Sequence, residues 1–229
     1  MVRRAMPAQH RGMKSATLIA MFTVIGLANA GTMPTEKSTE ASGNSETASI
    51  TLLVYDFAKL REAELVSWRK EVAHIMETAG VRVNWVACGR GSEFINQERC
   101  EHAQPGDLFL RILSGQTAKG PGLALGYLGL AEPDWGGRGR LTVMVNNVRD
   151  LASGTMWQFP DLLAHATAHE IGHLLGLIEH SPSGVMRADW RKGSIKLMNH
   201  AALVFSGSEA ERMQDEVSQR TARVLAQAK

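Results

Sequence analysis

The chain has 229 residues, of which 44% are hydrophobic and 21% charged, the size and composition of one globular domain. Its formal net charge is +2, but residues 1–30 hold four basic residues and no acidic one, and the rest of the chain holds 21 basic and 23 acidic residues. The remainder is nearly neutral, and its sequence shows no basic stripe of the kind that is typical of nucleic-acid-binding proteins.

The first thirty residues have the pattern of a secretory signal peptide. Basic residues end at Lys14, and the apolar run TLIAMFTVIGLA covers residues 17–28, which is shorter than a membrane-spanning helix requires. The small residues Ala28 and Ala30 have the spacing that precedes a cleavage site. We therefore expect residues 1–30 to be removed and the protein to be secreted or periplasmic, with an uncleaved membrane anchor as the alternative.

Residues 31–48 are small and polar and include no aromatic residue, so we expect a flexible linker that cannot bury enough apolar surface to fold. Residues 49–229 then form one folded domain. It contains two cysteines, Cys88 and Cys100. Because an exported protein meets an oxidising compartment, we expect them to form a disulfide, with two free buried thiols as the alternative.

The middle of the chain alternates strand and helix patterns. Runs rich in β-branched and apolar residues predict strands at 49–58, 81–88, 107–113 and 140–148, and a short edge strand at 123–131. Residues 60–79 carry apolar side chains at helical spacing and are followed by Gly80, which is typical of a helix end. The sequence therefore predicts an α+β domain built on one twisted mixed sheet.

Two further helices are predicted in the C-terminal third. One begins at Asp161 as its N-cap and ends at Gly176. The last begins at Ser208, which together with Glu211 has the S-x-x-E spacing of a capping box.

The segment HEIGH, residues 169–173, has the spacing of a metal site. On a helix, His169 and His173 lie one turn apart on the same face and can direct two imidazole nitrogens at one zinc ion. The carboxylate of Glu170 lies beside the first ligand, within reach of a metal-bound water. His165 shares this face, but we expect it to have a structural role.

A third ligand requires the chain to turn. If the helix continued, His180 would lie roughly 10 Å beyond His173 and could not bind the same ion. Gly176 is the residue at which a reversal costs least, because glycine accepts the left-handed conformation that ends helices. The segment after Gly176 can then return and present a side chain to the metal.

The sequence HEIGHLLGL, followed by HS and then VM, resembles the signature of the metzincin zinc metalloproteases. It is most similar to the matrixin type and to a group of small exported bacterial proteins. The resemblance implies a zincin-like catalytic domain over 49–229, with an active-site helix, a C-terminal helix, and Met186 as an apolar floor under the ligands. The strict signature places its third ligand at Glu179, one residue before His180. We favour His169, His173 and His180 as the zinc ligands, because HSPSGVM resembles the segment after the signature, with Glu179 as the alternative third ligand.

Three protein ligands leave a fourth position for water, which is typical of a catalytic zinc site. We expect a secreted zinc endopeptidase, in which Glu170 is the general base for a zinc-bound water and the edge strand at 123–131 binds an extended peptide. Its expected partner is a peptide or protein substrate, and we expect a monomer that binds neither nucleic acid nor, after signal removal, a membrane. A non-catalytic zinc-stabilised binding module and an amidase that acts on cell-wall peptides are the alternatives.

Overall fold

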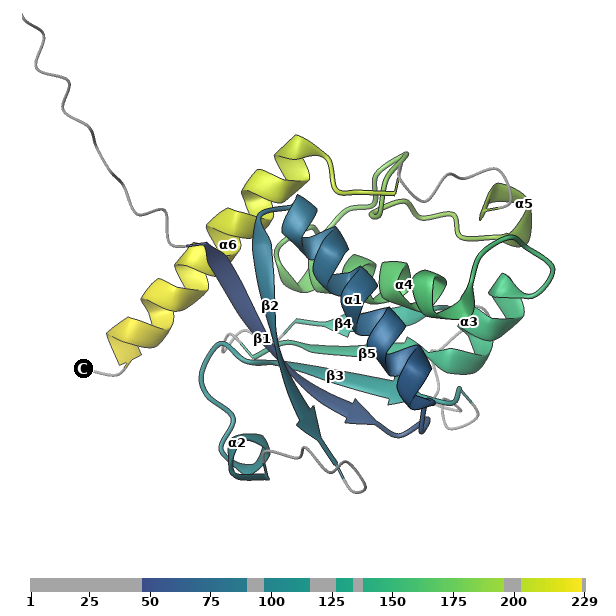
Figure 1. Cartoon of the computed structure of the whole chain (residues 1–229). Coiled ribbons are helices and arrows are strands. Elements are labelled where there is room, and N and C mark those ends of the chain that lie inside the picture. Colours follow the sequence, from purple (N-terminus) through teal and green to yellow (C-terminus); the bar gives the residue numbers. More distant parts are fainter. Residues whose placement is uncertain (1–46, 90–96, 116–126, 134–137, 196–202, 228–229) are drawn as a thin grey trace, which may run out of the picture. The chain divides into compact units, whose positions relative to one another are not determined.

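The fold is built on a five-stranded sheet with the strand order β2-β1-β3-β5-β4 (Figure 1). The strands are β1 (Ala48–Asp56), β2 (Val81–Cys88), β3 (Leu108–Leu113), β4 (Gly129–Glu132) and β5 (Arg140–Met144). All neighbouring strands are parallel except β4, which pairs antiparallel with β5. The predicted twisted mixed sheet is therefore confirmed, and β4 and β2 are its two edge strands.

The computed structural model describes residues 47–89, 97–115, 127–133, 138–195 and 203–227. These residues all belong to one unit of the chain, Asn44–Lys229. The predicted signal peptide at 1–30, all but two residues of the predicted linker, and residues 123–126 of the predicted edge strand lie outside the described residues.

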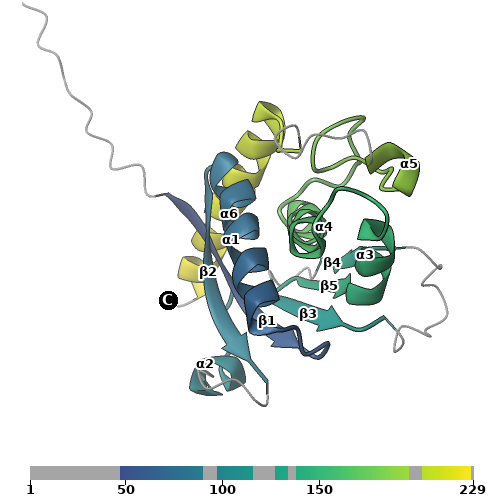
Figure 2. The same ribbon diagram turned by 45° about the vertical axis from the view of Figure 1, so that its right-hand side comes forward.

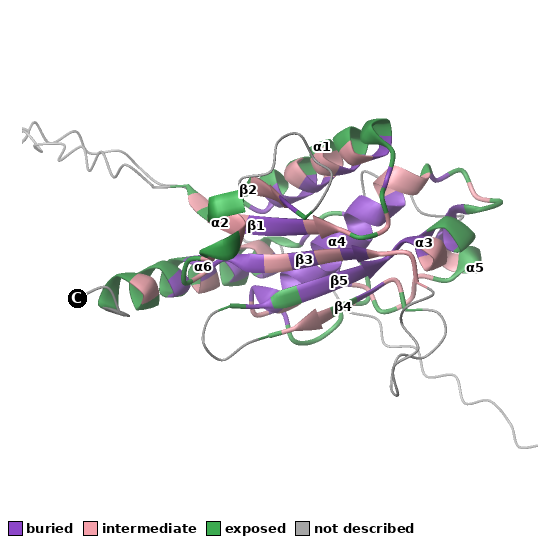
Figure 3. Ribbon diagram, turned by 90° about the horizontal axis from the view of Figure 1, so that it is seen from below, coloured by how far each residue is buried: buried purple, intermediate pink, exposed green. Residues whose placement is uncertain are grey.

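Three helices cover one face of the sheet (Figure 2). They are α1 (Glu62–Thr78), α3 (Val145–Ala152) and α4 (Phe159–Leu174). Alternate residues of the strands point toward them, as Leu108, Leu110 and Ile112 of β3 do, and all three are fully buried in the core. Since successive strand residues point to opposite faces, the residues between these three face the other side of the sheet, which Figure 3 shows from below.

The predicted strand at 140–148 is too long, because β5 ends at Met144 and α3 begins at Val145. The buried residues Val145 and Val148 are three apart, which is helical rather than strand spacing, and Leu151 continues the same face. In a short apolar run the two periods are hard to tell apart. This short helix was missed for that reason.

Two predicted helix starts are wrong by two or three residues. The N-cap of α4 is Gln158 rather than Asp161, because Pro160 takes a position in the first turn that favours proline. The capping box of α6 (Gly207–Gln227) is formed by Ser206 and Glu209 rather than by Ser208 and Glu211. The Ser206 N–H donates to the Glu209 carboxylate at 2.7 Å, and the Glu209 N–H donates to Ser206 Oγ at 3.4 Å.

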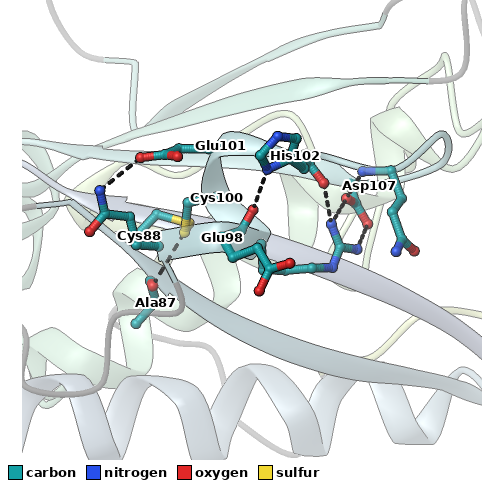
Figure 4. The surroundings of a disulfide bond; sticks show 10 residues. Ala87, Cys88, Glu98, Cys100, Glu101, His102 and Asp107 are labelled. Atoms are coloured by element: carbon teal, nitrogen blue, oxygen red, sulfur yellow. Dashed lines mark hydrogen bonds and ion pairs between the residues drawn. A yellow bond between two sulfur atoms is a disulfide. The ribbon is translucent and has the colours of Figure 1, made fainter.

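The predicted disulfide between Cys88 and Cys100 is confirmed. It joins the end of β2 to α2 (Gln97–Glu101), as Figure 4 shows. Next to it, the Arg99 guanidinium donates two hydrogen bonds, of 2.6 and 2.7 Å, to the buried carboxylate of Asp107 just before β3. Two consecutive residues of α2 therefore fix this short segment, Cys100 to β2 and Arg99 to the residue before β3. None of the described helices has the length and apolar character that a membrane span needs.

Candidate metal centre

The helix that carries the HEIGH segment, α4, lies in the middle of the molecule. It packs against α1, α3, β4 and β5, and its residues from Leu162 to Gly172 are all buried. A buried hydrogen bond of 3.0 Å from Trp68 Nε1 of α1 to Thr167 Oγ1 fixes its position relative to α1. His169 and Glu170 are each only 7% exposed. The polar side chains of the motif are therefore held in a rigid, largely apolar setting.

The rings of His169 and His173 are oriented by backbone carbonyl groups. Nδ1 of His169 donates to the carbonyl of Val185 at 2.8 Å, and Nδ1 of His173 donates to that of Leu177 at 2.6 Å. Each ring therefore carries its proton on Nδ1 and an unshared electron pair on Nε2. The two Nε2 atoms lie 3.1 Å apart.

The chain reverses directly after α4, as the sequence predicts. Gly176 has φ +89°, and the N–H of Leu177 donates to the carbonyl of Gly172 at 3.0 Å while that of Gly176 donates to His173 at 3.3 Å. This pair of bonds is a Schellman motif, which ends the helix and turns the chain back. It also places the Leu177 carbonyl where it orients the ring of His173.

The reversal brings His180 to the other two histidines. One nitrogen from each of His169, His173 and His180 lies within 4.8 Å of the others, and no other histidine, cysteine or acidic side chain joins this group in the described part of the chain. Glu179, the alternative third ligand, is exposed and does not belong to it.

The three histidines fit a zinc ion. Burial lowers the pKa of His169 to about 4 and also lowers the pKa of His173, so both rings are neutral at physiological pH. Two unshared pairs that face each other across 3.1 Å repel each other unless a cation lies between them. With Zn–N bonds of about 2.0–2.1 Å, tetrahedral coordination separates two ligand nitrogens by roughly 3.4 Å. The observed separation is close to that value, and backbone carbonyls that accept from Nδ1 are the usual outer partners of metal-binding histidines.

Glu170 lies next to the three histidines and under the edge strand. Its carboxylate accepts the backbone N–H of Ala131 in β4, and burial raises its pKa to about 7. Gly129 approaches it so closely that a Cβ there would lie 2.6 Å from Glu170 Cγ. The acid is therefore held between α4 and β4 and is not one of the three clustered residues.

Met186 and His165 lie where the sequence analysis expects them. Met186 is fully buried, and its sulfur lies so close to Gly172 of α4 that a Cβ there would be only 2.6 Å away. It thus packs against the helix turn that carries the histidines. His165 is buried, hydrogen bonds to the Asp161 carbonyl at 2.8 Å, and packs edge-on against Trp157. These contacts agree with a structural role.

The histidines open into a cleft of about 970 Å³ that follows the edge strand. Besides His169, Glu170, His173 and His180, its walls include Leu128 to Ala131, Pro133, Tyr127, Ile178 and Trp190. The ring centre of Trp190 lies 6.3 Å from that of His169, and its indole N–H donates to the Arg187 carbonyl at 2.7 Å. Sequence reasoning missed this tryptophan, because no motif surrounds it.

Comparison with known proteins yields similarity of structure but not of sequence. No family model matches the sequence, and no curated protein matches it. Solved structures with a similar fold include metalloproteinase-II from Bacteroides fragilis, at 13% identity and a TM-score of 0.46, and archaemetzincin from Methanopyrus kandleri, at 18% identity and a TM-score of 0.48. A third is the GM1-bound form of the ECX AB5 holotoxin, at 13% identity and a TM-score of 0.39.

The aligned regions cover about three quarters of the chain in each case: 75%, 76% and 76%. They cover 54% of the Bacteroides protein, 98% of archaemetzincin and 80% of the holotoxin chain. The chain thus spans little more than half the length of the Bacteroides protein. These similarities concern the fold alone.

Proposed function

We propose that the protein is a secreted zinc-dependent endopeptidase in which His169, His173 and His180 bind the metal and Glu170 is the general base. One observation carries this proposal. The buried His169 and the half-buried His173 direct unshared electron pairs at each other across 3.1 Å, and the chain reverses at Gly176 to add a third histidine from the loop. Three neutral imidazoles are a usual ligand set of catalytic zinc, which keeps one position open.

The residues around the cluster suit peptide hydrolysis. Zinc, when bound, acts as a Lewis acid that lowers the pKa of water and polarises a carbonyl group. The Glu170 carboxylate lies at the cleft wall beside His169, and in the proposed reaction it accepts a proton from the attacking water and passes it to the leaving amine. Met186 packs against Gly172, in the helix turn between His169 and His173.

The edge strand supplies a binding surface for an extended substrate. Among the described strands, β4 pairs with β5 alone, and Leu128 to Ala131 line the cleft. A peptide that adds to this free edge gains backbone hydrogen bonds whatever its side chains are. The site therefore suits a peptide or protein substrate, and we propose that the protein acts as a monomer.

The proposed location outside the cytoplasm is supported by the disulfide. A bond between Cys88 and Cys100 persists in an oxidising compartment and is rare in a reducing one. The signal-like residues 1–30 agree with export.

Replacement of the general base tests the proposal. We expect Glu170→Gln to bind as much zinc as the wild type and to cleave casein or a mixed peptide library at least about 100-fold more slowly, because general-base catalysis contributes that much or more. Undiminished cleavage by the variant would contradict the assigned base. If the wild type binds zinc but cleaves neither casein nor peptidoglycan fragments, the non-catalytic binding module is favoured. Cleavage of the fragments alone would favour the amidase.

A further inference from the structure

A second cavity lies on the face of the sheet that the three covering helices leave open. Its volume is about 660 Å³. Aromatic and cationic side chains line it together: Tyr55, Phe57, Phe109, Arg111, Arg138 and Arg140. Neither the metal site nor the proposed peptide hydrolysis accounts for this arrangement.

The strand register gathers these residues from four segments that are distant in the sequence. Tyr55 of β1 pairs with Arg111 of β3, and Phe109 of β3 pairs with Arg140 of β5. Arg140 in turn pairs with Glu132 of β4. The alternation of strand residues directs all of these side chains to the open face, the face shown in Figure 3.

The charges in the cavity are not balanced. Among the residues that the structure describes, Glu132 is the only acidic one in the lining, and it accepts hydrogen bonds of 2.8 and 3.1 Å from Arg140. Arg111 lies 3.4 Å from the same carboxylate and also donates to Thr142 Oγ1 at 2.8 and 3.1 Å. Three guanidinium groups against one carboxylate leave a net charge of +2 on the described lining residues. Such a cavity attracts an anionic ligand.

The cavity also has apolar walls. The rings of Tyr55 and Phe57 stack with their centres 6.2 Å apart and their planes 12° apart, and Phe57 is 59% exposed. A large exposed aromatic side chain beside arginines is typical of a binding surface, where the ring covers the apolar part of a ligand and the guanidinium binds its charge.

The cavity and the cleft of the metal centre share one lining residue at the end of the edge strand. Pro133, directly after β4, lines both cavities. Ala131, whose N–H bonds to Glu170, lies two residues before Pro133, a separation of roughly 7 Å along a strand. A peptide that lies along β4 and continues past its end therefore comes to this cavity roughly two to four residues from the reacting bond.

We propose that this cavity is a distal subsite that binds acidic side chains of the polypeptide substrate, two to four residues from the bond that is cleaved. The inference rests on the proposed peptidase function. A carboxylate forms paired, charge-assisted hydrogen bonds with a guanidinium group, and the stacked rings contact the methylene groups of a glutamate side chain or a neighbouring apolar residue. Substrates whose acidic residues lie on one particular side of the scissile bond are then preferred.

Matched peptides test the subsite. We compare decapeptides that carry Glu or Gln at the second to fourth positions on one side of the scissile bond, and repeat the comparison for the other side. For the wild type we expect the Glu peptide to have a kcat/KM about 3- to 10-fold higher on one side only, because one or two well-placed ion pairs contribute that much. We expect 0.5 M salt to reduce this ratio, since partly exposed charges are screened.

A pair of charge-reversal variants separates a local site from a general effect of net charge. Arg138→Glu should reduce the Glu-to-Gln ratio to near one. Arg82→Glu should keep the ratio, because Arg82 is exposed on β2 at the opposite edge of the sheet. An equal ratio on both sides of the scissile bond, a ratio near one in the wild type, or the same loss in both variants would overturn the proposal.

A binding measurement distinguishes failure of the subsite from failure of the proposed function. Fluorescence anisotropy of labelled Glu and Gln peptides with the Glu170→Gln variant needs no turnover. Tighter binding of the Glu peptide, lost on addition of Arg138→Glu, supports the subsite even if the wild type cleaves nothing. Cleavage of both peptides without discrimination in rate or binding would leave the peptidase in place and eliminate the subsite.

Discussion

Arg212 of α6 donates a hydrogen bond of 3.0 Å to the carbonyl of Gly176, the residue at which the chain reverses between His173 and His180. Two further residues of the same helix contact this segment. Arg220 donates to the carbonyl of Leu174, and the hydroxyl of Ser181 donates to Glu209. The C-terminal helix thus contacts the chain before, at and after the point of reversal, and it restrains the loop that carries the third histidine.

Loss of one of these contacts should weaken metal binding. We expect Arg212→Ala to raise the dissociation constant for zinc about 3- to 10-fold, because a hydrogen bond from an exposed charged group contributes roughly 1 kcal/mol. Competition with a chromogenic chelator measures the constant. Arg223→Ala is the control, since Arg223 lies on the same helix and bonds at 2.8 Å to Glu216 rather than to the turn. Equal effects of the two variants would show that α6 acts only through general stability.

Gly129 should position the general base. A Cβ at this residue would lie 2.6 Å from Glu170 Cγ and 2.7 Å from Oε1, so alanine must displace the carboxylate. We expect Gly129→Ala to keep its zinc and to lose at least about 10-fold in kcat/KM, because a small displacement of a catalytic group strongly lowers the rate of the reaction. Gly207→Ala is the matched control, since nothing lies within 4 Å of a Cβ there. Wild-type rates in Gly129→Ala would contradict this role.

The third ligand can be identified by metal analysis. His180 shares the cluster with His169 and His173, whereas Glu179 does not. Purified His180→Ala should contain much less zinc than the wild type, and Glu179→Ala should contain the same amount. The ratio of zinc to protein, measured by atomic emission, gives the answer. The reverse result would assign the third position to the carboxylate.

The metal centre could be predicted from the sequence because its geometry is local. A helix fixes the relation of His169, Glu170 and His173 through its pitch alone. Gly176 marks the reversal by its conformational freedom, and the structure shows that it has the expected positive φ. The sequence left His180 and Glu179 open, because a one-residue shift in a loop changes which side chain points inward, and only packing decides it.

The features that could not be predicted depend on contacts between distant segments. The arginine cavity exists because Arg111 and Arg140 lie on neighbouring strands that pair in one register, and periodicity within a segment does not determine that register. The same holds for Arg212, whose helical position gives no sign of its bond to Gly176. Helix α3 was missed for a different reason, since its eight residues are too few for the helical period to stand out.

Glu64 joins α1 to α3 away from the cleft. Its buried carboxylate accepts hydrogen bonds from Arg61 at 2.9 Å and from Arg149 of α3 at 3.0 Å. The hydrogen bond from the Arg61 side chain is the main reason why the pKa of Glu64 falls to about 2, with Arg149 adding to the effect. The unfolded chain has the ordinary glutamate pKa of about 4.3, so the unfolded state takes up the proton first as the pH falls.

The contribution of Glu64 to stability should therefore be complete above about pH 5 and should be lost as the pH falls from about 4.5 to about 2. We expect Glu64→Gln to lower the free energy of unfolding by about 1 kcal/mol at pH 7, a modest value because Arg61 is exposed to solvent and screened. At pH 2 the difference from the wild type should be much smaller.

Urea unfolding of both proteins at a series of pH values measures this difference in the free energy of unfolding, and comparison at equal pH cancels the protonation of other groups. Glu62→Gln is the control, because Glu62 is exposed in the same helix turn. A difference that stays constant from pH 7 to pH 2, or that equals that of the control, would contradict the assigned ion pairs.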